Sequence, residues 1–588
     1  MEHTQKPRSL GELICFSCEK WASKTAALYT IDGKFESITY RDFQQRIFQF
    51  AGALHHLGLK KGDCLALIAE NCLEWAILDW AAQTLGIILV PIYPTLPKEQ
   101  VSYIIKDSGS IILIAGTHLL ADKAKDIPDL NIILLKKEEG YAALEDLAIS
   151  KDFTFDYWRE NVGQVSPYDI ATYIYTSGTT GEPKGVMLTH HSFVYLAEHV
   201  VKFPFALDKD QQFILDEKDV FLSFLPLSHI FERMGGHILP YSIGATVGYV
   251  QSVASFAKDM LFVKPTVMLS VPRILESMHD RILDQVSRQT PMRKKLFFFA
   301  LHQGLLKAKG QFAPFFFLTD KLVGKKIRER TGGRLKYLIS GGAALSEELG
   351  MFYQAFGLDL FEGYGLTETC AMTTCNFPGK KKFGTVGIPL EGIEIKIAED
   401  GEILVRGPSI MKGYYHLDEA THEAIDSDGW FYTGDIGMFD GDFLKITDRK
   451  KNIIVLGNGK NVAPQPIENK LKSSPWIEES VLLGDGMEHI CALIVPNFEK
   501  LEHFAKEEGF LDVPLTQLVH EQKIRKLYKS QIDEVNASLA SFEKIKKFEL
   551  LTQSFSIEKG ELTPSLKVKR KIVSEKYQDL IRSMQRPH

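Results

Sequence analysis

The sequence predicts an α/β fold with a β-rich subdomain, arranged as a large N-terminal domain of several subdomains and a small α+β C-terminal domain. From about residue 40 to residue 450, short β-branched or apolar runs alternate with segments of helical period, which is typical of α/β proteins. After Gly387, the string "GIEIKIAEDGEILVRG" predicts two alternating strands joined at an Asp-Gly turn. Beyond about Asp448 the chain is slightly basic and richer in Lys/Glu helices. We therefore expect one domain over residues 1–448 and a second over residues 449–588.

Three short runs are predicted as strands of the large domain: "ATYIYT" from Ala171, "TVMLSV" from Thr266 and "LKYLIS" from Leu335. Turn residues and then a helical pattern are expected after each of them. Loops that follow such strands lie at the carboxyl ends, where open α/β sheets bind ligands. The run "AILDWAAQTLGIILVPIYP" from Ala76 contains polar residues and ends in prolines. We therefore expect a buried helix and a strand there rather than a membrane span.

The composition is ordinary for a globular protein and excludes several functional classes. Of 588 residues, 45% are apolar and 24% are charged, which argues against disorder and fibres. The net charge of -6 gives no whole-molecule field that would favour nucleic acid. The seven cysteines are sparse and odd in number, and the N-terminus lacks the apolar core of a signal peptide. We expect a cytoplasmic protein that does not bind nucleic acid.

The most informative string is "YTSGTTGEPKGVMLTH", from Tyr175 to His190. Between Thr176 and Gly185 it holds three glycines, four hydroxyl side chains and one lysine. Glycine permits positive φ and close backbone approach, and consecutive amides and hydroxyls can surround an anion. It is not a Walker loop, because Lys184 is followed by glycine rather than by Ser or Thr. The residues predict a phosphate-binding turn, with a flexible connector as the alternative.

The whole string resembles the phosphate-binding signature of the adenylate-forming (AMP-binding) superfamily. That family includes acyl-CoA synthetases, luciferases and peptide-synthetase adenylation domains, and its loop handles the triphosphate of ATP. The resemblance implies nucleotide-binding roles for the loop residues Thr176, Ser177, Gly178, Thr179, Thr180, Gly181 and Lys184.

Further motifs follow in the family's order across nearly the whole chain. "SGGAAL" from Ser340 resembles the adenine-side loop, and "GYGLTET" from Gly363 resembles the segment that stacks on adenine, meets the α-phosphate and helps to hold Mg²⁺. A neutral ring face offers dispersion to a purine, and a carboxylate is the hard oxygen ligand that Mg²⁺ prefers. The resemblance implies nucleotide-binding roles for Gly341, Gly342, Ala343, Tyr364, Gly365 and Thr367, and a metal-binding role for Glu368.

Two later strings resemble the family's ribose contacts and interdomain hinge. "YTGD" ends in Asp435, whose ionised carboxylate can accept hydrogen bonds from two hydroxyls. "DRKK" from Asp448 supplies Arg449 as a second ribose contact and Lys451 as the start of the hinge. The family rotates its small domain about this hinge, so the resemblance implies a mobile C-terminal domain.

The string "LTPSLKVKRKIV" from Leu562 resembles the family's late lysine motif and makes Lys567 the candidate catalytic residue of adenylation. Lysine is a compact charge that can meet both a carboxylate and a phosphate oxygen. The family's usual Ser-Gly before this lysine is Ser565-Leu566 here.

Two strings concern the other substrates. "GNGKNVAP" from Gly457 would approach after domain rotation, so that Gly459 lines the pantetheine path of CoA. "FLPLSHIFERMGG" from Phe224 contains His229, which resembles the family's catalytic gate beside the acyl carboxylate.

The reaction that the resemblance implies is ATP-dependent activation of a fatty acid. The strings "FLPLSHIFERMGG" and "DGWFYTGDIGMFDGDFLKITDRKK" resemble the long-chain fatty acid-CoA ligase form of the family. The carboxylate attacks Mg-ATP to give an acyl-adenylate and pyrophosphate, and the thiol of CoA then displaces AMP. An acyl-acyl-carrier-protein synthetase shares every nucleotide motif and stays open as an alternative. A non-catalytic lipid-binding protein is the alternative from another class.

Residues 292–330 combine basic clusters with "FFFA" and "PFFFL". This composition suits the interface of an anionic membrane, which would make the protein peripheral on the inner face of a membrane. The other interpretation is an internal helical insertion with buried phenylalanines.

Overall fold

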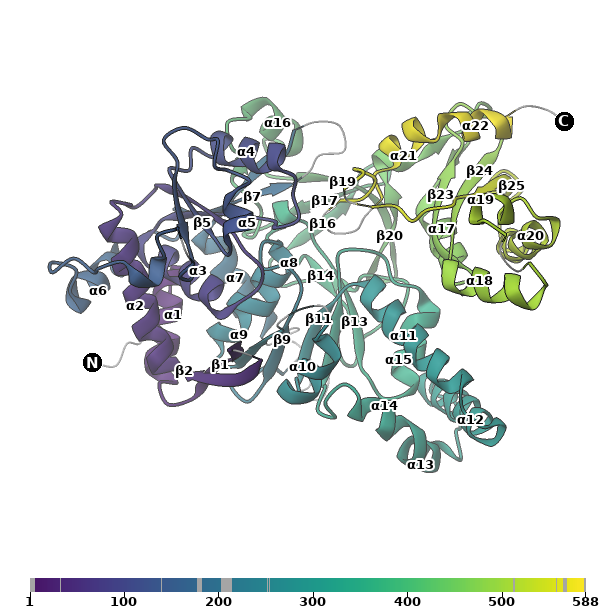
Figure 1. The fold of residues 1–588 in the computed structure, drawn as a ribbon, viewed down its shortest axis with the longest axis horizontal. Coiled ribbons are helices and arrows are strands. Elements are labelled where there is room, and N and C mark those ends of the chain that lie inside the picture. The colour runs from purple at the N-terminus through teal and green to yellow at the C-terminus, as the bar shows by residue number, and fades with distance from the viewer. Residues whose placement is uncertain are drawn as a thin grey trace. The chain divides into compact units, whose positions relative to one another are not determined.

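The computed structural model describes residues 6–585 except 32, 139, 177–181, 202–213, 251, 253, 511–512, 557 and 564–567. The chain divides into two compact units (Figure 1). Unit 1 comprises Met1–Lys396, Leu404–Thr433 and Phe439–Leu444, and unit 2 comprises Ile397–Ile403, Gly434–Met438 and Lys445–His588.

Unit 1 contains a nine-stranded sheet, counted over the described residues, whose central strands are parallel. The order across it is β15 (Ile388–Pro389), β14 (Thr374–Cys375), β13 (Leu360–Tyr364), β12 (Tyr337–Ser340), β11 (Val267–Ser270), β9 (Val220–Ser223), β10 (Thr246–Tyr249), β1 (Thr25–Ile31) and β2 (Lys34–Thr39). The strands predicted from Thr266 and Leu335 are confirmed as β11 and β12. Ser270 pairs with Ser340, and Ser340 with Glu362, so three carboxyl ends lie side by side.

A seven-stranded sheet in the described part of unit 1 has parallel strands followed by two antiparallel ones at one edge. Its order is β18 (Gly413–Tyr414), β8 (Lys184–Thr189), β7 (Ile170–Thr176), β4 (Ile88–Ile92), β3 (Cys64–Ile68), β5 (Ile112–Ala115) and β6 (Asn131–Leu134). All residues of β4 and β5 are buried, as expected for strands covered on both faces.

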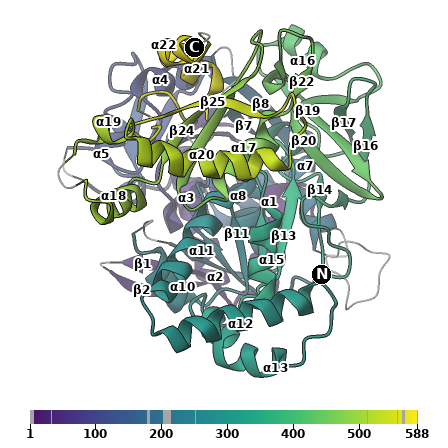
Figure 2. The same ribbon diagram turned by 90° about the vertical axis from the view of Figure 1, so that its right-hand side faces the viewer.

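Helices cover these sheets and separate their strands (Figure 2). They are α1 (Leu10–Lys20), α2 (Tyr40–His56), α3 (Leu73–Leu85), α4 (Lys98–Asp107), α5 (His118–Ala121), α6 (Phe155–Gln164), α7 (His190–Val200), α8 (Ile230–Glu232), α9 (Leu239–Ser242), α10 (Phe256–Val263), α11 (Pro272–Ser287), α12 (Pro291–Ala308), α13 (Phe316–Thr319), α14 (Lys325–Glu329), α15 (Glu347–Ala355) and α16 (Asp418–Ala424). The 3-10 helices η1 (Leu144–Asp146) and η5 (Thr367–Thr369) and the π-helices η3 (Arg233–Ile238) and η4 (Asp320–Gly324) complete the set.

The apolar run from Ala76 folds as the predicted buried helix and strand. Every residue of α3 is buried, so the helix is apolar around its whole circumference. It ends at Gly86, which takes the left-handed conformation with φ of 67°, and β4 begins two residues later. In the described part of the chain, no helix is long and apolar enough to cross a membrane.

The predicted hairpin at the Asp-Gly turn is also confirmed. The strands β16 (Glu394–Ile397), β17 (Glu402–Arg406), β19 (Phe431–Asp440) and β20 (Phe443–Arg449) form a four-stranded sheet through which the division into units passes. Gly401 has a φ of 86°, which a glycine adopts without strain. The Ala398 amide donates a hydrogen bond to the Glu402 carbonyl across the turn at 2.8 Å.

Unit 2 is built on the three-stranded sheet β23 (Ile477–Leu483), β24 (Ile490–Pro496) and β25 (Ile545–Leu550). Its other elements are η6 (Lys450–Asn452), the hairpin β21 (Ile454–Val455) and β22 (Asn461–Val462), and the helices α17 (Pro464–Lys472), α18 (Phe498–Glu507), α19 (Leu515–Leu518), α20 (Gln522–Ala537), α21 (Arg570–Lys576) and α22 (Gln578–Gln585). Both faces of the sheet are covered, because successive side chains of a strand point to opposite sides.

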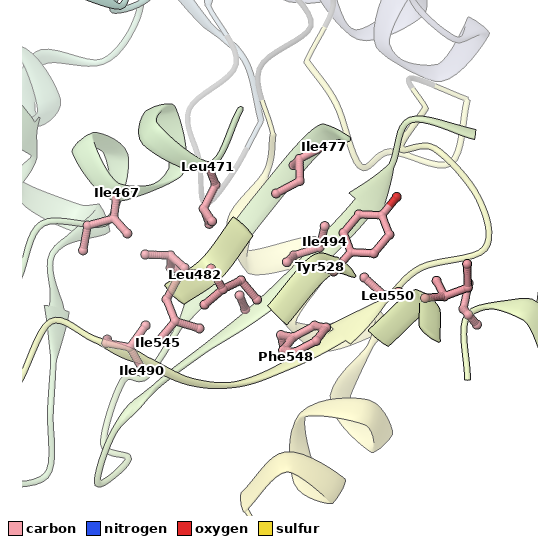
Figure 3. Close-up of a cluster of buried hydrophobic side chains, with 14 of the residues drawn as sticks. Ile467, Leu471, Ile477, Leu482, Ile490, Ile494, Tyr528, Ile545, Phe548 and Leu550 are labelled. Carbon is pink, nitrogen blue, oxygen red and sulfur yellow. The ribbon is translucent and has the colours of Figure 1, made fainter. Parts of the chain in front are cut away.

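The alternation is clearest on β24. Ala492 and Ile494 join the core that α17 and α20 cover, where Leu482, Tyr528 and Phe548 also pack (Figure 3). The intervening side chains join a second core, together with residues of α21 and α22: Cys491, Leu493 and Val495. The last two helices of the chain are therefore part of the folded unit.

Candidate active site

The phosphate-loop candidate lies in a β-hairpin of unit 1. β7 and β8 are antiparallel, and Thr176 at the end of β7 pairs with Lys184 at the start of β8. The prediction of a helix directly after the turn is wrong here, because "KGVMLT" alternates and forms β8 before α7 begins. Ser177, Gly178, Thr179, Thr180 and Gly181 lie outside the described residues.

Lys184 and Glu368 are joined through a residue that the sequence analysis missed. The Lys184 Nζ atom lies 4.9 Å from the centroid of the Tyr414 ring, and the Tyr414 hydroxyl donates to Glu368 Oε1 at 3.0 Å. Burial, followed by the charge of Glu368 and the hydrogen bond to it, raises the pKa of Tyr414. The tyrosine therefore stays neutral and can act as a donor to the carboxylate.

Backbone contacts fix this arrangement. β18 pairs with β8, with Tyr414 opposite Val186, and the Met411 amide donates to the Glu368 carbonyl at 2.8 Å. The "GYY" string from Gly413 gave only a weak strand signal, because two paired residues are too few to show a period.

The segment from Tyr364 to Ala371 forms a tight turn after β13. A Cβ atom at Gly365 would lie 1.8 Å from the Ala371 carbonyl oxygen, so only glycine fits. Cys370 and Ala371 both have positive φ, a costly conformation for residues with side chains. Thr367 and Glu368 lie within η5, and Tyr364 is buried at the end of β13.

The second glycine motif follows β12, at the edge where β11 and β13 also end. The Gly341 amide donates to the Ser270 carbonyl at 3.2 Å, and Gly342 has a φ of 79°. Gly342 and Ala343 are exposed. A Cβ atom at Gly341 would lie 3.0 Å from the ring of Phe231, so the α8 segment approaches this loop closely.

His229 caps the N-terminus of α8, two residues before Phe231. Its Nδ1 accepts a hydrogen bond from the Phe231 amide at 3.1 Å. The neutral ring therefore carries its proton on Nε2, which makes Nε2 a donor. The ring lies at a centroid distance of 6.4 Å from Tyr93, which follows β4.

A buried ion pair connects the α8 segment to the phosphate hairpin. Arg233 donates to both oxygens of Asp79, with distances of 2.8 and 2.6 Å, and its third donor meets Thr172 Oγ1 on β7 at 2.7 Å. Burial alone would raise the pKa of Asp79, but the charge of Arg233 and hydrogen bonds from His237 and Arg233 lower it. The pair ties α3, η3 and β7 together.

A second buried acid, Glu232, directly precedes Arg233 in the sequence. Burial raises its pKa to about 8, with Ser223 as a polar neighbour that offsets part of the shift. A Cβ atom at Gly236 would lie 2.2 Å from the Glu232 carboxyl, and one at Gly235 would lie 2.5 Å from Leu269. The two glycines thus allow close packing within unit 1.

In unit 2, the two ribose-contact candidates touch each other. Arg449 Nε lies 2.9 Å from Asp435 Oδ1, and the Asp435 carboxylate is almost completely buried. Lys450 forms ion pairs with Asp400 at 2.6 Å and with Glu402 at 2.8 Å. The hinge candidate Lys451 follows in η6 and is exposed.

Gly459 lies at the exposed tip of the β21–β22 hairpin. Its φ is 78°, and its amide donates to the Leu456 carbonyl at 2.8 Å. No heavy atom lies within 4 Å of the position that a Cβ would take at Gly459.

The catalytic candidate Lys567 lies outside the described residues, but the residues on both sides of positions 564–567 are described. Leu562 and Val568 form an antiparallel bridge, and the Lys569 amide donates to the Glu561 carbonyl at 2.8 Å. These contacts join the described residues on either side of positions 564–567.

Glu561, whose carbonyl accepts from the Lys569 amide, was also missed by the sequence analysis. Its fully buried carboxylate accepts from Lys576 at 2.6 Å, from the Ser556 amide at 3.1 Å and from the Tyr577 hydroxyl at 3.1 Å. A single Glu in a Lys/Glu-rich segment gives no signal in the sequence that it is buried.

The structure thus joins Thr176, Lys184 and Glu368 within unit 1, and Asp435 and Arg449 within unit 2. The chemistry of this donor set fits Mg²⁺, which binds through one or two carboxylates and completes its shell with water and substrate phosphates. Within the described residues, no group of three or more His, Cys, Asp or Glu residues could hold a metal.

The fold and these motifs define an adenylate-forming enzyme. Residues 16–415 match the family described as AMP-binding enzyme, and residues 451–586 match the AMP-binding enzyme C-terminal domain. The chain belongs to the AMP-binding family.

Relatives of known activity cover nearly the whole chain. The chain is 34% identical over 566 residues to the long-chain-fatty-acid–CoA ligase FadD15 of Mycobacterium bovis, which covers 93% of this chain and 92% of that protein. It is 31% identical over 591 residues to long-chain-fatty-acid–CoA ligase 5 of Rattus norvegicus, with coverage of 94% and 84%.

Solved structures share the fold. The adenylation domain of a carboxylate reductase from Mycobacterium chelonae matches with a TM-score of 0.76 at 22% identity, covering 99% of this chain and 91% of that one. The anthranilate CoA ligase AuaEII, in complex with anthranoyl-AMP, matches with a TM-score of 0.73 at 21% identity, covering 99% and 100%.

Proposed function

We infer that the protein is a long-chain fatty acid-CoA ligase that uses ATP, Mg²⁺ and CoA. The fatty carboxylate oxygen attacks the α-phosphorus of ATP, and the bond to pyrophosphate breaks. The CoA sulfur then attacks the acyl carbon of the adenylate, and AMP leaves with the former carboxylate oxygen. The inference is supported by 34% identity to a long-chain-fatty-acid–CoA ligase over 93% of the chain.

The single structural observation that carries the site is the chain of contacts from Lys184 through Tyr414 to Glu368. It sets a cation and an acid beside a hydroxyl-rich hairpin, as a magnesium-bound triphosphate requires. Bound Mg²⁺ would neutralise phosphate charge during the attack. We assign triphosphate contacts to Thr176, Ser177, Gly178, Thr179, Thr180, Gly181 and Lys184.

The adenosine end is assigned to two groups of residues. We propose that Gly341, Gly342 and Ala343 border the adenine. Tyr364 stacks on it, Gly365 permits the turn, and Thr367 meets the α-phosphate. In unit 2, Asp435 accepts from the ribose hydroxyls. The guanidinium of Arg449 orients that carboxylate through the contact at 2.9 Å.

The acyl end is assigned to His229. With its proton on Nε2, the ring can donate a hydrogen bond to the fatty carboxylate without carrying a charge. Because Phe231 adjoins both His229 and Gly341, the acyl and adenine ends of the site lie close together.

The two half-reactions are assigned to two faces of a C-terminal domain that begins at residue 449. Lys567 would serve adenylation by stabilising the charge that moves from carboxylate to phosphate. After rotation about Lys451, Gly459 would line the pantetheine path. The bare tip at Gly459 supports this role, because a narrow thioester channel needs a residue without a side chain.

The same proposal places the enzyme in the cytoplasm, in peripheral contact with the inner face of a membrane that holds its fatty acid. CoA is the proposed thiol acceptor, and an acyl carrier protein is the acceptor that the following test separates from it.

The test is a panel of carboxylic acids of increasing length, supplied with ATP and Mg²⁺ and scored by release of pyrophosphate and AMP. We expect AMP release with palmitate to require CoA and to fall for short acids. AMP release that requires acyl carrier protein instead of CoA would overturn the choice of acceptor. No pyrophosphate release with any long-chain acid would overturn the proposed function.

A further inference from the structure

Residues 292–330 of unit 1 expose several large apolar side chains. The helices α12 and α13 lie side by side at the edge of unit 1 in both views (Figure 1, Figure 2). The exposed fraction is 81% for Met292, 86% for Phe312 and 85% for Phe317. Leu296, Phe298, Phe299, Phe315, Leu318 and Leu322 are also exposed. The interpretation as an insertion with buried phenylalanines is therefore wrong for most of them.

The opposite side of α12 is firmly packed, so this exposure does not come from a loosely attached helix. Phe297 is buried and its ring lies 5.4 Å from that of Phe356. A Cβ atom at Gly304 would lie 2.1 Å from the Ala355 carbonyl oxygen, so α12 packs too closely against α15 for a side chain at this position. The helix buries one apolar face and presents a second apolar face outward.

The outward side chains of α12 and of the segment after it form one surface, which we call the α12–α13 face. The rings of Phe299 and Phe315 lie at a centroid distance of 5.7 Å. The Phe315 amide donates to Gln303 Oε1 at 3.1 Å, and Thr319 Oγ1 donates to the Phe315 carbonyl at 3.0 Å. These bonds hold the phenylalanine-rich loop against α12.

Cations surround this face. Residues 291–330 contain ten Lys or Arg and two acids, whereas the whole chain has a net charge of -6. Both acids are paired within the segment, Asp320 with Arg328 at 2.6 Å and Glu329 with Lys325 at 3.9 Å. The exposed cations include Arg293, Lys295, Lys307, Lys309, Lys321 and Lys326.

We propose that the α12–α13 face docks on a bilayer that contains anionic lipids. Aromatic and aliphatic side chains would enter the boundary between headgroups and acyl chains, while the lysine stems reach back to lipid phosphates. An acidic protein would engage the cations and leave the phenylalanines in water. A second copy of the chain would bring like charges together. The link to fatty acid supply rests on the proposed function, whereas binding to lipid does not.

The experiment is cosedimentation of the full chain with vesicles, without nucleotide or fatty acid. One vesicle population is phosphatidylcholine alone, and the other is an equimolar mixture of phosphatidylcholine and phosphatidylglycerol. The apolar variant is Phe312→Ser/Phe317→Ser, and the charge variant is Lys321→Glu/Lys326→Glu. The matched controls are Leu119→Ser, at another exposed apolar residue, and Lys60→Glu/Lys151→Glu, at other exposed lysines.

We expect the wild type and both controls to bind the mixed vesicles and to bind phosphatidylcholine more weakly. Each α12–α13 variant should lower the partition coefficient on mixed vesicles by about tenfold. Wild type that binds neither vesicle, or an apolar variant that binds like wild type, would overturn the proposal. Loss in the charge variant alone would favour an acidic protein partner instead. A wild-type dimer that the apolar variant dissociates, without vesicle binding, would identify a second copy as the occupant.

Fatty-acid-dependent exchange of pyrophosphate into ATP, measured with albumin-delivered palmitate, checks that each variant is folded. Exchange in all variants should match wild type within about twofold, because the substituted residues are exposed. If wild type binds vesicles but shows no exchange with any acid, the proposed function fails while the docking face stands.

Discussion

At the residue scale, Tyr414 links a lysine and an acid that come from distant motifs of the sequence. Its ring contacts Lys184 and its hydroxyl binds Glu368, so the orientation of both depends on it. The buried, neutral phenol keeps one oxygen of the Glu368 carboxylate engaged, and we propose that the other oxygen binds Mg²⁺.

Replacing Tyr414 with phenylalanine keeps the ring beside Lys184 and removes the hydrogen bond to Glu368. A hydrogen bond to a charged group contributes about 1.5–3 kcal/mol, so we expect the rate of adenylation at low Mg²⁺ to fall by about tenfold or more. Saturating Mg²⁺ should restore most of it. The control is Tyr415→Phe, one residue later, and the measurement is pyrophosphate release against Mg²⁺ concentration. An unchanged Mg²⁺ dependence in Tyr414→Phe would contradict the role given to Tyr414.

Replacing Lys567 with alanine removes the proposed charge partner of adenylation. We expect adenylation to slow by about a hundredfold, by analogy with loss of one transition-state donor. Thioester formation from supplied acyl-adenylate should be largely retained, and Lys569→Ala is the matched control. Both half-reactions are measured separately, and equal loss in both would refute the assignment.

At the element scale, the buried pair of Asp79 and Arg233 sets the positions of three elements that flank the site. α3 supplies the acid, η3 the guanidinium, and β7 the hydroxyl of Thr172. β7 ends in Thr176 and η3 follows His229 by a few residues, so the pair fixes the β7–β8 hairpin relative to His229, which we propose contacts the acyl carboxylate.

Replacing Asp79 with asparagine leaves a buried guanidinium without its counter-charge. Loss of one partner from a buried pair costs about 3–5 kcal/mol, so the unfolding midpoint in urea should fall steeply. Asp126→Asn, in an exposed ion pair with Lys98, should leave the midpoint unchanged. Equal midpoints for Asp79→Asn and wild type would show that the pair does not support unit 1.

At the scale of the whole molecule, the sequence predicted the order of the motifs better than the contacts between them. Thr176, Lys184 and Glu368 could be proposed as site residues from the sequence because long strings carried them. Tyr414 and Glu561 could not, because each is defined by a tertiary contact that local patterns do not encode.

The elements of the fold also divide into those that local sequence patterns predict and those that they do not. The strand and helix from Ala76 were predictable because burial on all sides leaves an unbroken apolar run. The hairpin of β7 and β8 was not predicted, because the sequence pattern led us to expect a helix after the glycine-rich turn rather than a second strand. The composition of residues 292–330 suggested an interface with a membrane, but only the structure shows which phenylalanines are exposed.

Buried acids should make unit 1 sensitive to alkali. Burial raises the pKa of Glu232 to about 8 from an ordinary value of 4.5, and it raises that of Glu362 to about 8 as well. The folded state therefore holds these protons where the unfolded state has lost them. Their contribution to stability is fully present below pH 4.5 and is lost as the pH rises through about 8.

The amide side chain in Glu232→Gln stays neutral at every pH. The unfolding temperature of the variant should therefore rise relative to that of wild type as the pH rises from about 6 to about 9. The exposed Glu36→Gln is the control and should run parallel to wild type. A constant difference between Glu232→Gln and wild type across this range would rule out a protonated Glu232 in the folded protein.

The central claim is that the β7–β8 hairpin and Glu368 hold ATP while a long-chain carboxylate is adenylated. The most direct measurement is exchange of labelled pyrophosphate into ATP, with palmitate and Mg²⁺ but without CoA, in wild type and in Lys184→Met. We expect palmitate-dependent exchange in wild type that falls by at least about tenfold in Lys184→Met. Exchange that proceeds without palmitate, or that is equal in the two proteins, would contradict this claim.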